Sequence, residues 1–187
     1  MLFYSSTQLQ HEDFPNAPFA ALSETGLDPQ YLELDISASV LMKHPERTIH
    51  ILKSIKDQGV RVSADNVGHG YSSLSSIRKL PLDALKIDGH LFAGLDAIPN
   101  LKRQLRATIK MGRSLNLRVI AGGVETAEHL EYLWDHNCDE AQGYFLGEPV
   151  SPEKLSRRSI RVGALNRKTV VKAIDRSRMA LKIEGAA

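Results

Sequence analysis

Carboxylate, amide and ammonium side chains recur in this sequence directly after short apolar segments. They are Asp35, Asp65 with Asn66, Lys86 with Asp88, Glu125, and Gln142. Carboxylate oxygens are the ligands that Mg²⁺ and Mn²⁺ prefer, and a lysine can offset the charge of a phosphate. If the segments are neighbouring strands, these side chains form a site for a phosphorylated ligand and a divalent metal. One acid after a strand means little alone, because a helix N-cap explains it equally well.

The segments that must position these residues alternate between short β-rich stretches and longer amphipathic ones, which is typical of parallel β/α units. The expected strands cover residues 2–5, 31–36, 60–65, 84–87, 118–121 and 140–144. The expected helices cover residues 14–25, 45–58, 72–80, 101–115 and 127–136. Gly26 and Gly59 each follow a helix, as left-handed C-cap residues do. Six strands fit either a doubly wound sheet or part of an eight-stranded barrel, and both place chemistry at the C-terminal strand ends.

Four separated blocks of the sequence resemble, in order and spacing, the signature blocks of the EAL domain family. They are LELDIS (32–37), ADNVGHGYSSLSSIRKLPLDALKID (64–88), VIAGGVET (119–126) and CDEAQGYFLGEPVSPEKL (138–155). The resemblance implies an α/β fold, an incomplete triosephosphate-isomerase-type (β/α) barrel with about six parallel strands. In intact members it also implies hydrolysis of cyclic-di-GMP to pGpG, in which two metal ions activate a water and neutralise developing charge.

The sequence departs from the family pattern at the metal-binding positions. The strand with the Glu-Ala-Leu motif is expected before Met1, so we interpret the chain as N-terminally truncated. The family's metal-ligating asparagine in the next strand corresponds to Phe3, which cannot ligate a metal. The metal-binding glutamate of LELDIS is replaced by Asp35, with a shorter reach, and the glutamate three positions later is Ala38.

Two further positions lose negative charge. The paired aspartates of the family appear as Asp65 and Asn66, and the first glutamate of the A-E-G-V-E block is Gly122. By resemblance, we assign catalytic roles to Lys86 and Glu125, substrate binding to Lys86, Asp88 and Gln142, and metal positions to Asp35, Asp65 and Asn66. We expect the metal positions to hold Mg²⁺ or Mn²⁺ weakly or to be vacant. Lys86 with Asp88 also reads as a structural ion pair.

The function we expect is that of a degenerate EAL-domain protein in cyclic-di-GMP signalling. It acts without catalysis, through protein contact or through residual binding of the dinucleotide. The alternatives are an active metal-dependent phosphodiesterase, and a gene remnant or mis-assigned start without a function of its own. An incomplete barrel leaves two unpaired strand edges, so self-association across them is another expected contact.

Charge divides the chain into two parts. Residues 1–156, the expected barrel domain, carry 15 Lys or Arg and 20 Asp or Glu, whereas residues 157–187 carry nine and two. Residues 167–182 of this tail read as a basic amphipathic helix, which is usually a solvated face and alternatively contacts nucleic acid or a membrane. The first residues have no basic flank or long apolar run, so we expect a cytoplasmic protein.

Overall fold

The computed structural model describes residues 2–4, 16–68, 74–92 and 99–148. These residues form one sheet of six parallel strands in the order β1-β2-β3-β4-β5-β6. The strands are β1 (Leu2–Tyr4), β2 (Glu33–Ser37), β3 (Arg61–Val67), β4 (Ala84–Ile87), β5 (Arg118–Ala121) and β6 (Glu140–Ala141). The predicted α/β fold with consecutive parallel strands is confirmed.

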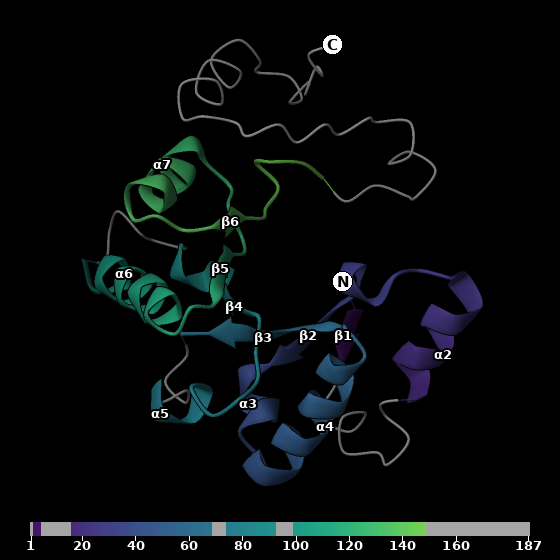
Figure 1. Ribbon diagram of the computed structural model, residues 1–187. Helices are drawn as coiled ribbons and strands as arrows, with labels where there is room; N and C mark the ends of the chain where they lie inside the picture. The colour runs from purple at the N-terminus through teal and green to yellow at the C-terminus, as the bar shows by residue number, and fades with distance from the viewer. Residues whose placement is uncertain (1, 5–15, 69–73, 93–98, 149–187) are drawn as a thin grey trace.

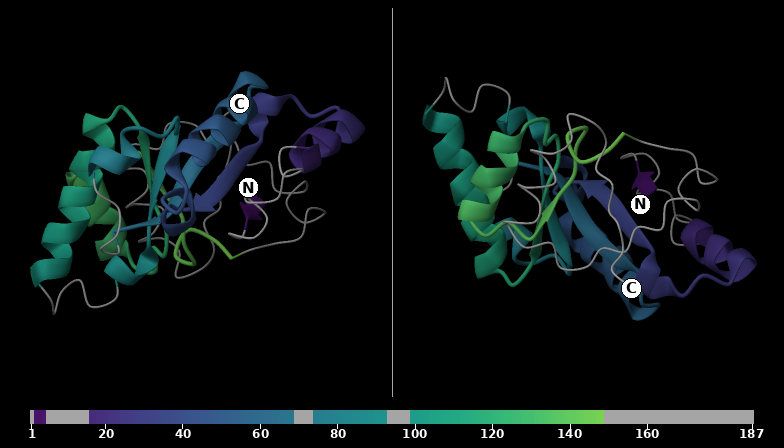
Figure 2. Two further views of the ribbon diagram at one scale, coloured as in Figure 1. Left: turned by 90° about the horizontal axis from the view of Figure 1, so that it is seen from below. Right: turned by 90° about the horizontal axis from the view of Figure 1, so that it is seen from above.

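Helices connect the strands and follow one another around one side of the sheet (Figure 1). They are α2 (Asn16–Thr25), α3 (Ala38–Leu41), α4 (Pro45–Asp57), α5 (Leu74–Ile77), α6 (Pro99–Ser114) and α7 (Ala127–Asp135), with 3-10 turns η1 (Pro29–Tyr31) and η2 (Gly89–Leu91). Helix α2 lies beside β1, at the other end of the sheet from α6 and α7 (Figure 2). No described helix is long and apolar enough to cross a membrane.

Most predicted elements are confirmed within a few residues, and the differences have local causes. Tyr31 was expected in a strand, but Pro29 and the Asp28 cap bend the chain into η1, so β2 starts at Glu33. The last strand was expected to reach Tyr144 and stops at Ala141, because the chain after Gln142 turns back onto Val124. Helix α5 ends at Ile77 rather than Leu80.

Two apolar clusters of buried side chains hold the helices against the sheet. One lies around β2 and β3 and includes Leu34, Ile36 and Leu52, and the other lies around β5 and includes Ile109 and Val119. These five side chains have no exposed surface. The helix predicted at 167–182 and the proposed division after residue 156 lie outside the described residues.

Candidate functional site

The C-terminal ends of β3, β4 and β5 line an open cavity of about 500 Å³. Its lining includes most of the residues singled out in the sequence: Asp65, Asn66, Lys86, Asp88, Gly122 and Glu125. Parallel strands bring their carboxyl ends to one edge of the sheet, so residues far apart in the chain meet there. The predicted gathering of these side chains at one rim is therefore observed.

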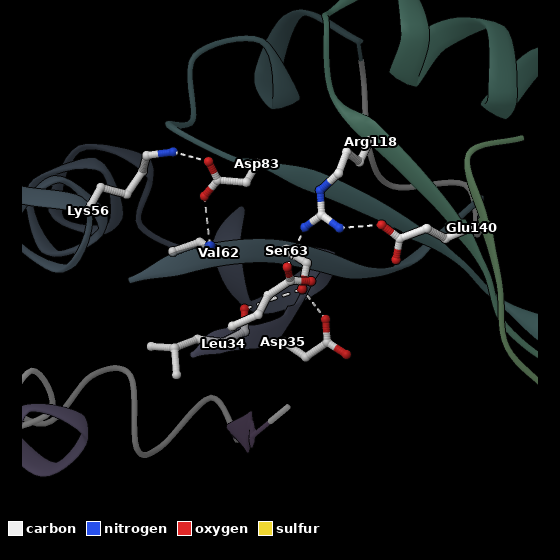
Figure 3. A network of polar contacts seen from close by, with 9 residues as sticks. Leu34, Asp35, Lys56, Val62, Ser63, Asp83, Arg118 and Glu140 are labelled. Atoms are coloured by element: carbon white, nitrogen blue, oxygen red, sulfur yellow. Dashed lines mark hydrogen bonds and ion pairs between the residues drawn. The ribbon is translucent and has the colours of Figure 1, made fainter. Parts of the chain in front are cut away.

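Asp35 and Lys86 form a buried ion pair beneath this cavity. The Lys86 ammonium donates to Oδ2 of Asp35 at 2.9 Å, and the two side chains are 9% and 0% exposed. The Ser63 hydroxyl donates to the other carboxylate oxygen, Oδ1 (Figure 3). Both oxygens of Asp35 thus accept hydrogen bonds from the protein, and Asp35 does not line the cavity. A carboxylate committed in this way is a poor ligand for a metal ion in the cavity.

A β-bulge places Asp65 and Asn66 at the cavity wall. The register with β4 runs from Ala64 paired with Leu85 to Val67 paired with Ile87, so two residues of β3 oppose Lys86 alone. Asn66 has a φ of 57°, in the left-handed region that asparagine tolerates better than most residues. Bulges of this kind redirect side chains at strand ends and next to active sites. Here the bulge brings the Asp65 and Asn66 positions to the same wall as Lys86.

Asp65 is half-buried at this wall. Burial raises the pKa of its carboxyl above the ordinary value, whereas a hydrogen bond with the Asn66 backbone and the positive charge of Lys86 act in the opposite direction. The negative charges of Asp35 and Asp88 raise the pKa further. The Asp65 carboxyl therefore holds its proton more tightly than a solvent-exposed aspartic acid does.

Asp88 caps the turn η2 and holds a histidine at the rim. Its Oδ1 accepts from the backbone N–H of His90 at 2.9 Å and lies 2.7 Å from the Nδ1 atom of the same ring. His90 is largely exposed and lines the cavity. Asp88 therefore acts as a cap, the structural role that an acid after a strand often has. The same carboxylate also lines the cavity.

Glycines allow the loops after β4 and β5 to pack backbone against backbone. A Cβ atom on Gly123 would lie 2.5 Å from the Cα of Gly89, and the φ of Gly123 is 75°. At Gly122, where the family pattern has a glutamate, a Cβ atom would lie 3.8 Å from Cε of Lys86. A side chain at position 122 would thus stand next to Lys86, and the glycine supplies no carboxylate at this position.

A second, smaller cavity of about 330 Å³ adjoins the first. The two share Lys86, Gly122, Gly123 and Glu125, and the second adds Gln142 and the exposed ring of Tyr144. The predicted substrate-binding residues Lys86, Asp88 and Gln142 are therefore divided between two connected compartments. Their roles in binding stay predictions.

The donors that the described residues offer do not fit a pair of divalent cations. Among the described residues, no three His, Cys, Asp or Glu side chains lie close enough together to hold a metal ion. Asp35 is committed to Lys86 and Ser63, Asn66 offers only a neutral amide, and position 122 offers no ligand. Two-metal sites need several carboxylates to balance the charge of both ions.

Neither Ser63 nor the bulge was predicted from the sequence. Two positions that were compared with the family pattern, Ala38 and Phe3, lie on elements other than β3, β4 and β5. Ala38 is buried at the start of α3. Phe3 pairs in register with Asp35 across β1 and β2, and its side chain lies outside what the structure describes. The serine could have been suspected only from a correct strand register, since it carries no motif of its own.

The comparisons with known proteins agree on one family. The EAL domain profile matches residues 3–149. A signaling protein of Caulobacter vibrioides is 37% identical over 152 residues, which are 81% of this chain and 19% of that protein. The cyclic di-GMP phosphodiesterase NbdA of Pseudomonas aeruginosa is 38% identical over 130 residues, which are 70% of this chain and 17% of that protein. The chain thus spans about a fifth of the curated relatives it matches.

Solved structures match the fold as well. The PaMucR phosphodiesterase in complex with c-di-GMP superposes with a TM-score of 0.79 at 33% identity, covering 82% of this chain and 62% of that one. The EAL domain of Mycobacterium smegmatis DcpA superposes with a TM-score of 0.76 at 33% identity, covering 83% and 70%. The described sheet and helices therefore correspond to a large part of these domains.

Proposed function

Because the chain belongs to the EAL domain family, we propose that it is a module of cyclic-di-GMP signalling that does not hydrolyse the dinucleotide. It acts by holding the dinucleotide, by contacting another protein, or by both. The observation that carries the proposal is the commitment of Asp35. Its two oxygens are taken by Lys86 and Ser63, so the carboxylate that the family pattern assigns to a metal stabilises a lysine.

The substitutions around this pair support the same conclusion. Gly122 removes a carboxylate beside Lys86, and Asn66 replaces a charged ligand by a neutral one. Second-shell changes alone typically cost about 10-fold to 100-fold in metal affinity or activity. Loss of direct ligands costs more, because each dication then has less negative charge to balance it.

Residual binding of the dinucleotide is supported by the two adjoining cavities. They share the Lys86 ammonium, which is suited to a phosphate oxygen, and Gln142 lines the second compartment. A relative of known structure, PaMucR, is described as a c-di-GMP complex. A cyclic dinucleotide has two base-carrying halves, which suits a cavity with two compartments.

A hydrolysis assay with the full chain tests the proposal. The chain is incubated with cyclic-di-GMP and either Mg²⁺ or Mn²⁺, and pGpG is followed by liquid chromatography. We expect no release above the buffer background. Steady release of pGpG that Asp65→Ala abolishes would overturn the proposal.

A matched variant tests whether the lost carboxylates are the reason that metal ions are not held. In Asp35→Glu/Asn66→Asp/Gly122→Glu, two carboxylates are regained and a third regains the length of the family's glutamate, and we expect its affinity for Mn²⁺ to exceed that of the natural chain. Calorimetry with cyclic-di-GMP forms the second arm of the experiment. Binding that Gln142→Ala weakens supports the receptor role, because this exposed side chain lines the second cavity, and the absence of binding leaves protein contact as the function.

An active phosphodiesterase is the second candidate function. It is favoured by the gathering of Asp65, Lys86 and Glu125 around one cavity and by the activity named for the relative NbdA. Such activity needs metal ligands beyond those of the described residues. Hydrolysis that depends on Mn²⁺ concentration and is lost in Glu125→Gln would establish it.

A further inference from the structure

Helix α6 carries an unusual concentration of positive charge. Its residues Pro99–Ser114 include five Lys or Arg and no Asp or Glu. Outside this helix, residues 1–156 carry ten Lys or Arg and 20 Asp or Glu. A third of the basic residues of the expected barrel domain therefore lie in one helix, against an acidic background.

The five cations share one face of the helix, which we call the basic stripe: Lys102, Arg103, Arg106, Lys110 and Arg113. At 3.6 residues per turn, these positions fall within an arc of about 100°. The core residues Leu105, Thr108 and Ile109, with which α6 packs on β4 and β5, lie on the adjoining side of the helix. The stripe extends about 16 Å along the helix, with one or two cations in each turn.

The middle of the stripe is available for an outside partner. Arg103, Arg106 and Lys110 are exposed and make no ion pair within the described part of the chain. They stand at positions i, i+3 and i+7, so they point the same way from successive turns. Arg113 shows what such a side chain binds, since its guanidinium lies 3.2 Å from a carboxylate oxygen of Asp139 and donates to the Asn137 carbonyl at 2.8 Å.

We propose that the basic stripe of α6 is a docking surface for an acidic helix of a partner protein. A facing helix with Glu or Asp on one side presents a carboxylate in every turn, at the spacing of the cations. Arginine, which supplies three of the five, forms two parallel hydrogen bonds with a carboxylate. Clusters of arginines are a recurrent means of recognising acidic motifs.

The surroundings of the stripe favour a narrow partner over an extended polyanion. A nucleic acid or an anionic bilayer spreads charge beyond the stripe and meets the acidic remainder of the domain. Of the described residues, the large exposed apolar side chains are Leu27, Tyr31 and Tyr144, and none of these lies on α6. The helix therefore offers no aromatic ring for stacking on bases and no large apolar side chain for insertion into a membrane.

Two synthetic peptides test the docking surface. Both have the same composition of Glu, Ala, Leu and Gln and form helices, but only one places every Glu on a single face. Binding of each labelled peptide to the full chain is followed by fluorescence anisotropy. We expect the one-faced peptide to bind at least about tenfold more tightly, as three additional exposed ion pairs allow, and its affinity to fall as salt is added.

Charge reversal locates the contact. Arg103→Glu/Arg106→Glu/Lys110→Glu should weaken binding of the one-faced peptide at least about tenfold. The control Lys43→Glu/Lys53→Glu/Lys79→Glu makes the same change in net charge at exposed positions outside α6, and we expect less than about a twofold effect. If the charge-reversed variant does not fold, Arg103→Gln/Arg106→Gln/Lys110→Gln takes its place.

Three results would contradict the proposal. They are equal binding of the two peptides, an equal effect of the control substitutions, and tighter binding of a short DNA duplex or of phosphatidylglycerol vesicles than of the one-faced peptide. The last result would assign the stripe to a polyanion instead. None of them bears on hydrolysis, so this proposal and the proposed function fail independently.

Discussion

Lys86 on β4 and Asp35 on β2 form an ion pair across the strand that separates them, and Ser63 on that strand binds the same carboxylate. The lysine thus has a fixed counterion inside the protein. In a site built around metal ions, a carboxylate at this position would face the metals. Here the shorter side chain of Asp35 remains below the cavity, and the Lys86 ammonium occupies the position of a metal ion beside the carboxylate.

The buried ion pair of Lys86 and Asp35 should contribute to the stability of the fold. Lys86→Met leaves Asp35 buried and without its counterion, so the free energy of unfolding should fall by about 3–5 kcal/mol. In the double variant Lys86→Met/Asp35→Leu no charge is left unpaired, and at least about half of the loss should be recovered. Urea unfolding followed by circular dichroism measures both.

The control for these variants is a partly exposed ion pair. Lys56 contacts Asp83 with both side chains about 30% exposed, so Lys56→Met should cost about 1 kcal/mol or less. A loss as large as that of Lys86→Met would show that burial of the pair is not the reason.

Arg118 and Glu33 form a second ion pair between strands that are not neighbours in the sheet, β5 and β2. In a flat sheet these strands would lie about 14 Å apart, so the contact requires a curved sheet with both side chains on its concave side. Arg118 also donates to the more exposed Glu140 (Figure 3). Arg118→Met should lower the free energy of unfolding by about 1–3 kcal/mol, because Glu33 loses its partner.

A substitution of the more exposed partner of Arg118 separates the two contacts. Glu140→Gln should cost no more than about 1 kcal/mol. If thermal unfolding shows equal losses for Arg118→Met and Glu140→Gln, the link between β2 and β5 does not contribute to stability.

Gly123 is required by both its conformation and its neighbour. Gly123→Ala would place a Cβ atom 2.5 Å from the Cα of Gly89 at a φ of 75°, and we expect a loss of about 1–3 kcal/mol. Gly147→Ala is the control, because a Cβ atom there has no neighbour within 4 Å. Melting temperatures of the two variants should differ clearly, and similar values would contradict the close approach of the two loops.

Asp65 makes a prediction about pH. Its pKa is raised in the folded state, so the folded protein holds the proton more tightly than the unfolded chain does. The contribution of Asp65 to stability is then fully present below the unfolded pKa and is lost as pH rises through the folded pKa. Asp65→Asn should therefore be more stable than the natural chain at about pH 7. Its advantage should be smaller at about pH 3.5, where the Asp65 carboxyl is largely protonated in the folded and in the unfolded state. Denaturant midpoints at the two pH values test this, and an equal difference at both would contradict it.

The order of elements could be predicted from the sequence because its signals are local. Gly26 and Gly59 end their helices with φ values of 66° and 86°, as their type and position predicted. The polar residues after each strand were predicted to meet at one rim, and the parallel sheet brings Asp65, Lys86 and Glu125 together there.

The partners of these residues could not be predicted, because they depend on register. Asp35 lies 28 residues from Ser63 and 51 from Lys86, and no local pattern fixes such a pairing. The bulge at Asp65 and Asn66 was also missed, because the alternating apolar pattern of β3 reads as a continuous strand. The available signal was Asn66 itself, because asparagine adopts the left-handed conformation more readily than most residues. That signal is ambiguous without knowledge of the neighbouring strand.

A manganese titration of the full chain tests the central claim most directly. Free Mn²⁺ is followed by electron paramagnetic resonance in the presence of cyclic-di-GMP, with Asp35→Glu/Asn66→Asp/Gly122→Glu in parallel. Because Asp35 is bound to Lys86 and Ser63, we predict that the natural chain takes up no pair of ions at micromolar Mn²⁺ and that the variant binds more tightly. Uptake of two ions per chain by the natural protein, lost in Asp65→Ala, would contradict the account.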